Sequence, residues 1–368
     1  MIARAAISLI LFLMFCCKPD PGDQGLVDRH ASPETRALYK NLMEVSRHAT
    51  LFGHQDDLAY GVHWKREEGR SDVLESSGAY PAVYGWDISW IGISPFNIDT
   101  VDFDDMAHWI AQGYSRGGVI TLSWHMNNPN GGSSWDTARA VYNIIPGGSL
   151  HDWYKGRLDA AAAFMNRLHG PDGEMVPVIF RPFHEHTGSW FWWGRGNCTA
   201  EEYIALWRFT VEYLRDVKDI HHLLYAYSTD VFRDEADFLE FYPGDEYVDI
   251  LAFDDYHGIH SEESLPGFVH RLQMLADLGE RKNKVVALTE TGLERIPISD
   301  WWTQVLLRGL KEGKRDMGMA WVLIWRNANE GHHYAPYEGH PSEADFRLFR
   351  SDPYILFEDD LPDMYSRK

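Results

Sequence analysis

Short apolar runs alternate with longer stretches of helical periodicity along most of the chain. Runs such as VPVIF, LLYAY and KVVAL are almost continuously apolar. Such runs are typical of parallel strands that are covered on both faces. The pattern predicts eight strands, at residues 51–55, 82–87, 119–125, 176–185, 223–228, 248–254, 284–290 and 319–326.

The stretches between these runs have the spacing of amphipathic helices. Residues 154–169 carry one apolar stripe, and residues 201–217 and 262–278 carry similar ones. Thr199 followed by Glu202 has the form of a capping box at a helix start. Eight strand-then-helix units in one domain predict an α/β fold, a single (β/α)8 TIM barrel. The alternative is a doubly wound open sheet, but neither GxGxxG nor GxxxxGK[ST] follows any predicted strand.

The first 17 residues follow a different pattern. One Arg is followed by an apolar run from Ala5 to Phe15 and then by Cys16 and Cys17. The run is too short for a transmembrane helix and is typical of a secretory signal. A Cys directly after the apolar core resembles a bacterial lipobox, and Cys17 is the predicted lipidation site because the small Cys16 would precede the cut. A plain secretory signal is the alternative.

This segment also sets the predicted domain boundaries and location. Residues 1–17 form the signal, residues 18–32 a flexible tether that begins KPDPGDQG, and residues 33–368 the barrel domain. We therefore expect export across the inner membrane and a lipoprotein at the cell surface or in the periplasm. Its membrane contact would be through the N-terminal anchor alone.

Composition excludes several classes of protein. The chain has 55 acidic and 34 basic side chains, a net charge of -21, which disfavours binding to nucleic acid because phosphates are bound by Lys and Arg. Three Cys cannot form a disulfide scaffold, and Cys198 fits an inert packing residue. The 15 Trp are the unusual feature, since amphipathic indole rings suit sugar faces, protein interfaces and membrane belts.

Polar and aromatic side chains follow nearly every predicted strand. In a barrel the C-terminal ends of the strands form the active site, so we expect these residues to meet in one cleft. They are His54, Gln55, Asp56 and Asp57; Trp86 and Asp87; Trp124, His125, Asn127 and Asn128; Arg181, Phe183, His184, Glu185 and His186; Asp254, Asp255, Tyr256 and His257; Glu290; and Trp325, Arg326 and Asn327.

Two of these carboxylates are candidates for cleavage of a glycosidic bond. Such cleavage needs one acid to protonate the leaving oxygen and a second carboxylate opposite it. Glu185 and Glu290 each end an apolar strand among small or polar neighbours, in HEHTG and TETG. His184 and His186 flank Glu185 and can tune its affinity for a proton. A structural ion pair is the alternative for either Glu alone, but both together among many Trp favour catalysis.

A metal site is the main alternative use of the histidines. On a strand, His184 and His186 would share one face and Glu185 the other, unless the strand ends there. No HExxH occurs, and the acidic pairs at 56–57 and 254–255 lack EF-hand spacing. The sequence therefore predicts neither a metal nor another cofactor. The loop residues 131–136 and 146–148 are expected to shape the cleft, and Phe191, Trp192 and Trp193 to form its wall, with core packing as the alternative.

Seven segments together resemble glycoside hydrolase family 26, the β-mannanase family: FGHQDD, GWDI, SWHMNNP, RPFHEHTGSWFWWG, DDYH, LTETG and WVLIWRN. They occur in this order from about residue 51 to residue 327. The resemblance implies that Glu185 is the general acid/base and Glu290 the nucleophile of a retaining double displacement. It also implies substrate-binding roles for His125, His184, Trp190, Asp254, Tyr256, Trp325, Arg326 and Trp86.

The implied function is an endo-acting β-1,4-mannanase that hydrolyses β-mannan or manno-oligosaccharides. A mannobiose-releasing exo enzyme and a β-glucanase or xylanase of the same family remain open. Two alternatives lie outside this class: a carbohydrate-binding lipoprotein without activity, and a metal-dependent barrel hydrolase of amides. The carboxyl separation provides a geometric test, since retaining pairs lie roughly 5–5.5 Å apart and inverting pairs roughly 6.5–9.5 Å.

Overall fold

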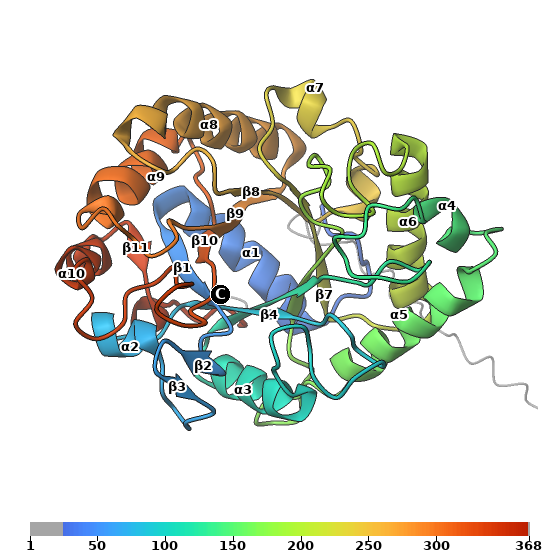
Figure 1. Ribbon diagram of the computed structural model, residues 1–368, viewed down its shortest axis with the longest axis horizontal. Helices are drawn as coiled ribbons and strands as arrows, with labels where there is room; N and C mark the ends of the chain where they lie inside the picture. The colour runs from blue at the N-terminus through green and yellow to red at the C-terminus, as the bar shows by residue number, and fades with distance from the viewer. Residues whose placement is uncertain (1–24, 367–368) are drawn as a thin grey trace, which may run out of the picture.

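The computed structural model describes residues 25–366, so the predicted signal, including Cys17, lies outside the described residues. All eight predicted strands are present, and they form one closed parallel barrel (Figure 1). Closure comes from the first and last strands, which pair from Leu51 with Trp321 to His54 with Ile324. In barrel order the strands are β1 (Thr50–Gln55), β4 (Val83–Asp87), β5 (Val119–Trp124), β6 (Val178–Pro182), β7 (Leu223–Thr229), β8 (Ile250–Asp255), β9 (Val285–Thr291) and β10 (Trp321–Ile324). The predicted TIM barrel is confirmed.

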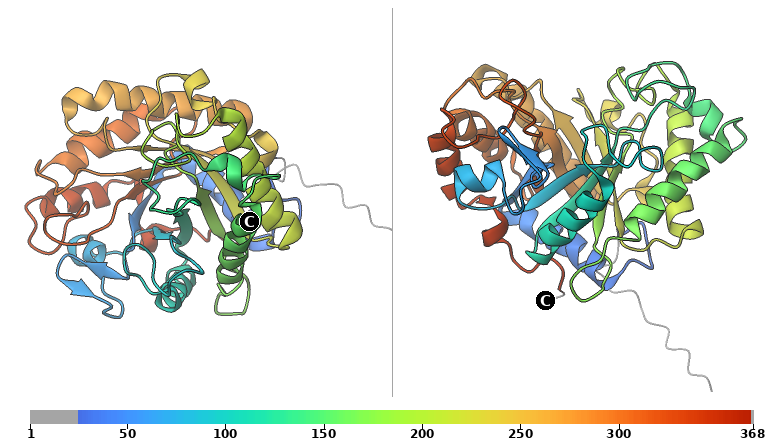
Figure 2. Two further views of the ribbon diagram at one scale, coloured as in Figure 1. Left: turned by 45° about the vertical axis from the view of Figure 1, so that its right-hand side comes forward. Right: turned by 60° about the horizontal axis from the view of Figure 1, so that its bottom comes forward.

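Helices surround the barrel on the outside (Figure 2). The longer ones are α1 (Pro33–His48), α3 (Phe103–Ser115), α5 (His151–Met165), α6 (Ala200–Glu212) with the π-helix η2 (Tyr213–Val217), α8 (Leu265–Lys282), the π-helix η5 (Trp302–Leu307) with α9 (Arg308–Gly313), and α10 (Glu343–Ser351). The capping box predicted at 199–202 is present, because Glu202 N donates to Thr199 Oγ1 and Thr199 N donates to Glu202 Oε2.

The loops between these helices and strands contain several short elements. A small antiparallel hairpin follows β1, and β11 extends the sheet by pairing in parallel with the start of β1. These elements are β2 (Tyr60–Gly61), β3 (Trp64–Lys65), α2 (Asp72–Ser77), α4 (Val141–Ile144), α7 (Glu235–Phe238), β11 (Ile355–Leu356) and the 3-10 turns η3 (Asp245–Tyr247), η4 (Glu262–Ser264) and η6 (Glu358–Asp360).

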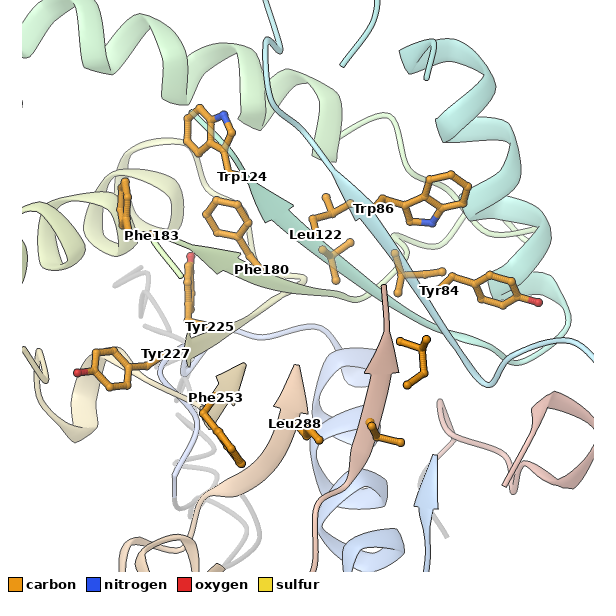
Figure 3. Packing of buried hydrophobic residues seen from close by; sticks show 14 of the residues in the cluster. Tyr84, Trp86, Leu122, Trp124, Phe180, Phe183, Tyr225, Tyr227, Phe253 and Leu288 are labelled. Carbon is orange, nitrogen blue, oxygen red and sulfur yellow. The ribbon is translucent and has the colours of Figure 1, made fainter. Parts of the chain in front are cut away.

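Each strand contributes to two hydrophobic cores because successive side chains point to opposite faces. The inner core fills the barrel with residues such as Leu51, Val83 and Trp321. The outer core lies between strands and helices, where Tyr84, Trp86, Leu122, Phe180, Tyr225, Phe253 and Leu288 are buried (Figure 3). With both interior and exterior filled, the open surface for chemistry is left to the strand ends and their loops.

The end of β6 differs from the prediction, which continued the strand to Glu185. The strand ends at Pro182, and Phe183 and Glu185 both have left-handed backbone, with φ of 52° and 53°. Proline has no N–H for the ladder, and two left-handed residues turn the chain out of the strand direction. The chain therefore leaves the sheet just before Glu185, and the strand alternation expected for His184, Glu185 and His186 does not apply.

The end of β9 contains a second irregularity. Phe253 of β8 pairs with Leu288, but the next residue, Asp254, pairs with Glu290, so Thr289 is an extra residue in β9. Such a bulge re-aims the side chains that follow it. Here Thr289 Oγ1 donates to Asp254 Oδ1 over 2.6 Å, and Glu290 also turns toward the barrel mouth, where Arg181 binds it.

The last part of the predicted tether packs against the barrel. Val27 is buried, and its N–H donates to Asp249 Oδ1 over 2.7 Å. Ser32 N donates to the carbonyl of His221 over 2.7 Å. Among residues 25–366, no helix is long and apolar enough to cross a membrane.

Candidate active site

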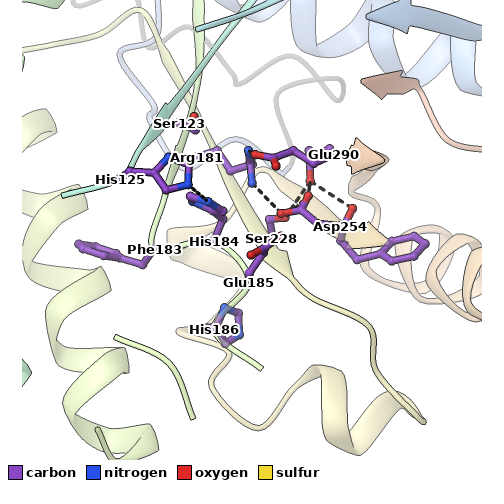
Figure 4. Close-up of polar contacts among 12 residues, drawn as sticks. Ser123, His125, Arg181, Phe183, His184, Glu185, His186, Ser228, Asp254 and Glu290 are labelled. Atoms are coloured by element: carbon purple, nitrogen blue, oxygen red, sulfur yellow. Dashed lines mark hydrogen bonds and ion pairs between the residues drawn. The ribbon is translucent and has the colours of Figure 1, made fainter. Parts of the chain in front are cut away.

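Three carboxyl groups and one guanidinium meet at the C-terminal mouth of the barrel (Figure 4). Glu185 follows β6, while Asp254 and Glu290 end β8 and β9. One carboxylate oxygen from each of the three lies within 4.8 Å of the others. Arg181 of β6 reaches across the barrel to Asp254 and Glu290. The sequence thus correctly predicted that Glu185 and Glu290, 105 residues apart in the numbering, face one another.

The spacing of this pair distinguishes between the two classes of glycosidase geometry. Retaining pairs are separated by about 5–5.5 Å, whereas inverting pairs leave room for a water at about 6.5–9.5 Å. The close oxygen atoms of Glu185 and Glu290 lie within 4.8 Å. This short distance between oxygens is consistent with the closer, retaining arrangement, and retention stays a prediction.

Glu290 is held at both oxygens. Arg181 Nη2 donates to Oε1, and the Tyr256 hydroxyl donates to Oε2 over 3.1 Å. The same guanidinium donates from Nη1 to Asp254 Oδ2 over 2.8 Å. A carboxylate fixed in this way by a charged and a neutral donor is oriented as an attacking group needs to be. Arg181 was named among the strand-end residues, but its role in holding Glu290 could not be predicted, because its partners are 73 and 109 positions away along the chain.

Glu185 has a different environment from Glu290. It is partly buried, and its Oε2 accepts a hydrogen bond from Trp190 Nε1 over 2.7 Å. Burial, followed by the nearby charges of Asp254 and Glu290, raises the pKa of Glu185 well above its ordinary value, while the Trp190 N–H works in the opposite direction. The shift favours the protonated form of Glu185, the form that a general acid requires.

Asp254 lies beneath the pair and has no exposed surface. Besides Arg181, it accepts hydrogen bonds from Thr289 Oγ1 over 2.6 Å and Ser228 Oγ over 3.2 Å. Burial raises the pKa of Asp254 to about 7; Arg181 opposes this change and Glu290 adds to it. All its close partners belong to the protein, and a direct contact with a sugar hydroxyl stays a prediction.

A metal ion is the other possible use of three close carboxyl groups. Within residues 25–366, Glu185, Asp254 and Glu290 are the one set of His, Cys, Asp and Glu side chains with suitable spacing. Arg181 is already hydrogen bonded to two of them, so a cation there would meet a fixed positive charge at contact distance. The donor set is therefore better suited to acid/base and nucleophilic chemistry than to holding a metal.

Aromatic side chains lie near the carboxyl groups. Trp190 and Tyr256 are partly exposed and donate hydrogen bonds to Glu185 and Glu290, and Trp325 is partly exposed with its ring centroid 6.2 Å from that of His125. Their contact with a sugar stays a prediction. Trp135 was not predicted as a site residue; it is 50% exposed and stacks on His125 with ring centroids 5.5 Å apart. It belongs to the loop 131–136, so part of this loop lies beside His125, and the expectation that the loops 131–136 and 146–148 shape the cleft stays a prediction. An exposed Trp in a Gly- and Ser-rich loop after a strand was the signal available in the sequence.

Four of the predicted wall residues pack in the core instead. Trp86 is fully buried and stacks on Trp109 of α3 at 6.0 Å, because it points outward from β4 while Asp87 points inward. Its predicted role as a cleft wall is therefore wrong. Phe191, Trp192 and Trp193 are also buried, with exposed fractions of 2%, 0% and 0%. Their core-packing alternative is correct; Trp193 Nε1 donates to the carbonyl of His184 and so supports the segment that carries Glu185.

The two predicted histidines contact each other. His125 Nε2 and His184 Nε2 are 3.2 Å apart (Figure 4). On its other side, His125 Nδ1 lies 2.8 Å from Asp87 Oδ2. His184 has no exposed surface, and His125 is 6% exposed. The structure thus brings both histidines to the site, and their direct contact with a sugar stays a prediction.

Arg326 follows β10 and contacts residues of two other loops. Its Nη2 is 2.9 Å from Asp99 Oδ1, and its Nη1 donates to the Tyr60 hydroxyl over 3.3 Å. The side chain is 22% exposed. These contacts join the loops after β10, β4 and β1, and the predicted binding of sugar hydroxyls by Arg326 remains open to test.

Comparison with known proteins agrees with this geometry. The sequence model of glycosyl hydrolase family 26 matches residues 27–326. A mannan endo-1,4-beta-mannosidase from Bifidobacterium adolescentis is 35% identical over 350 residues, covering 88% of this chain and 34% of that protein. The chain thus spans about a third of the length of this relative.

Solved structures are also similar to the fold. A family 26 β-mannanase from Bacteroides ovatus superposes with a TM-score of 0.87 and 42% identity, covering 92% of this chain and 98% of the other. A modular endo-β-1,4-mannanase from Cellulomonas fimi superposes with a TM-score of 0.86 and 35% identity, covering 93% of this chain and 79% of the other. The overall fold is therefore similar to that of these two enzymes.

Proposed function

The chain belongs to glycosyl hydrolase family 26, and on that premise we propose that it is an endo-acting retaining β-1,4-mannanase that hydrolyses β-mannan or manno-oligosaccharides. One observation carries the proposal: Glu185 and Glu290 lie within 4.8 Å of each other in opposite electrostatic environments. Glu290 is held by Arg181, whereas burial and the neighbouring carboxyl groups raise the pKa of Glu185 and favour its protonated form. The names of the relatives support mannan as the substrate.

In the first step, Glu290 attacks the anomeric carbon while Glu185 gives its proton to the departing glycosidic oxygen. The bond between the anomeric carbon and that oxygen breaks, and a glycosyl ester forms on Glu290. Tyr256 and Arg181 hold the carboxylate of Glu290 so that one oxygen faces the sugar. Trp190 holds Glu185 on the side where the leaving sugar departs.

In the second step, Glu185 acts as a base. It takes a proton from a water molecule, which attacks the anomeric carbon and releases Glu290. Once the ester has formed, Glu290 no longer carries a negative charge, so one of the charges that raise the pKa of Glu185 is absent. The same carboxyl group can therefore give a proton in one step and accept one in the next.

A time course of product sizes tests the proposal. Purified enzyme is incubated with mannan, glucomannan, lichenan and xylan, and products are separated by length. We expect mannan to give a broad range of oligosaccharides early, with the first product formed in the β-anomeric configuration. Early release of mannobiose alone would show exo rather than endo action. Faster hydrolysis of lichenan or xylan than of mannan would show a different substrate. An α-anomer formed first would contradict the retaining mechanism.

The hydrogen bond from Trp190 gives a pH prediction. An N–H donor stabilises the ionised carboxylate, so Trp190→Phe removes a contact that lowers the pKa of Glu185. Glu185 then stays protonated to a higher pH, and the alkaline limb of kcat/KM should move to higher pH. The measurement is the pH profile of kcat/KM on manno-oligosaccharides for both proteins. A limb that is unchanged or moves to lower pH would show that another group sets it.

We also propose that the protein is exported and acylated at Cys17, which would place the barrel on the membrane surface through its N-terminal segment. The support is the sequence pattern of residues 1–17 alone. Mass spectrometry of the mature protein tests this directly. A lipid-modified N-terminal Cys17 is the expected result, and an unmodified N-terminus beyond residue 17 would contradict it.

A further inference from the structure

Asp87 at the end of β4 is a buried carboxylate to which neither the sequence nor the mechanism assigns a role. It has no exposed surface and accepts four hydrogen bonds. Its Oδ1 accepts from Ser89 N over 2.8 Å, and its Oδ2 accepts from Ser123 Oγ over 2.8 Å and from His125 N over 3.1 Å. The fourth contact, at 2.8 Å, is with His125 Nδ1, which must donate because an ionised carboxylate only accepts.

This contact determines how protons are arranged on the two histidines. With a proton fixed on Nδ1 of His125, its Nε2 faces His184 Nε2 at 3.2 Å. A hydrogen bond between two nitrogens needs one proton between them, supplied by one ring or the other. Either neutral His125 accepts from His184, or His125 is an imidazolium and donates to it. The two arrangements differ by one positive charge at the cleft.

The surroundings favour the charged arrangement, with the charge on His125. Burial alone would lower the pKa of His125, but the contacts with Asp87, together with the charges of Glu290 and Asp99, raise that pKa above its ordinary value. Burial, then the charge of Arg181, lowers the pKa of His184 well below the ordinary range. For Asp87, burial favours the acid form, but the contacts with His125 and Ser89 together lower the pKa. These directions favour a proton on His125 over one on His184, and they agree with the four donors that the geometry places around Asp87.

Groups on several elements face the two rings. The charged and titratable ones are Asp87 of β4, Asp99 of the following loop and Glu290 of β9 around His125, and Arg181 of β6 and His186 around His184. The remaining neighbours are aromatic: Trp135, Phe191, Trp193 and Trp325. Carboxylates therefore dominate around His125, and the cation dominates around His184.

A positive charge here would act on the catalytic centre. Three carboxyl groups lie within 4.8 Å of one another, and Arg181 is the guanidinium that binds two of them. Glu290 is among the charges that act on His125, and the attraction is mutual. We propose that Asp87 is a positioning residue of the active site: it orients His125 and keeps a second proton on its ring, so that an imidazolium stands beside the Glu290 carboxylate.

The alternative is that Asp87 only ties the ends of β4 and β5 together. Nitrogen NMR of the full chain with 15N-labelled histidine separates the two roles, because the ring shifts report how many protons each ring carries; His125→Gln assigns the signals. We expect both ring nitrogens of His125 to be protonated at pH 7 in the unaltered protein and one to be protonated in Asp87→Asn. A singly protonated His125 in the unaltered protein, or the same titration in both proteins, would overturn the proposal.

Kinetics supply a second readout, which rests on the proposed mannanase function. At pH 7, Asp87→Asn should lower kcat on manno-oligosaccharides by about tenfold. A factor of ten corresponds to a fall of one unit in the pKa of His125. KM should stay within about twofold, and the lost activity should return as the pH is lowered and His125 regains its proton. A loss that is the same at every pH would contradict the proposal.

Asp249→Asn is the matched control. Asp249 is likewise a fully buried carboxylate that accepts two hydrogen bonds, from Val27 N and Tyr225 N, but it lies at the opposite end of the barrel. It should lower stability without changing the His125 signals or the shape of the pH profile. If the unaltered protein has no activity on mannan, the proposed function fails, while the NMR comparison still decides the protonation of His125.

Discussion

Replacement of Glu290 by alanine should lower kcat on mannan by more than about 10,000-fold, the range seen when an enzyme loses a group central to covalent catalysis. The physical reason is that no other carboxylate can reach the anomeric carbon in its place. Asp254 is the nearest alternative, but it is fully buried and already bound by Arg181, Thr289 and Ser228. Sugar binding, by contrast, should be nearly unchanged, because the aromatic walls remain.

Two measurements on Glu290→Ala separate chemistry from binding. Turnover is followed by release of reducing ends, and affinity for manno-oligosaccharides by calorimetry. The control is Glu294→Ala, four residues along the chain, whose carboxylate pairs with His332 near the surface and is 47% exposed. It should keep nearly full activity. If Glu290→Ala kept more than about a tenth of the activity, Glu290 would not be the nucleophile.

The fold could be predicted because its signal is local and repeated. An apolar run such as LLYAY is buried on both faces wherever it lies in the barrel, so each strand is visible without knowledge of its partner. The eight predicted runs all became strands, with boundaries that shift by a few residues. The largest difference is at β6, where the apolar pattern continues through Phe183 but the backbone does not, because Pro182 and the left-handed Phe183 end the ladder.

The direction in which site residues point was harder to predict. The periodicity of a strand assigns each residue to one face, and it would have separated Glu185 from His184. A left-handed turn at Glu185 and a bulge at Thr289 remove that constraint for both proposed catalytic residues, Glu185 and Glu290. These irregularities depend on contacts between distant segments, such as the bond from Glu185 N to the Ser228 carbonyl, which no local pattern records.

Only some of the Trp side chains are free to contact a sugar. Trp135, Trp190 and Trp325 are at least partly exposed, whereas Trp86, Trp124, Trp192 and Trp193 are buried. Both groups lie at strand ends or in the segments that follow them, so position along the chain does not distinguish them. Burial does, and it is decided by which helix or loop covers each ring.

Replacement of Glu185 by alanine should have an effect that depends on the leaving group. A sugar leaving group needs a proton, so turnover of mannan should fall by about 100- to 10,000-fold, the usual contribution of a general acid. An aryl mannobioside with an acidic phenol can depart unprotonated, so formation of the glycosyl ester on Glu290 should stay fast. Hydrolysis of this ester also needs Glu185, as the base, and should become slow in the variant.

The expected signature is therefore a burst of phenol followed by slow turnover, with a glycosyl-enzyme of the corresponding added mass. Rapid-mixing kinetics and intact mass spectrometry measure the two parts separately. Trp190→Phe is the matched comparison. It removes the hydrogen-bond donor to Glu185 but leaves the carboxyl group in place, so it should show no burst. If substrates with acidic and with poorly acidic leaving groups lost activity equally in Glu185→Ala, protonation of the leaving oxygen would have to come from another group. The asymmetry between a protonated Glu185 and a guanidinium-bound Glu290 would then have a structural rather than a catalytic origin.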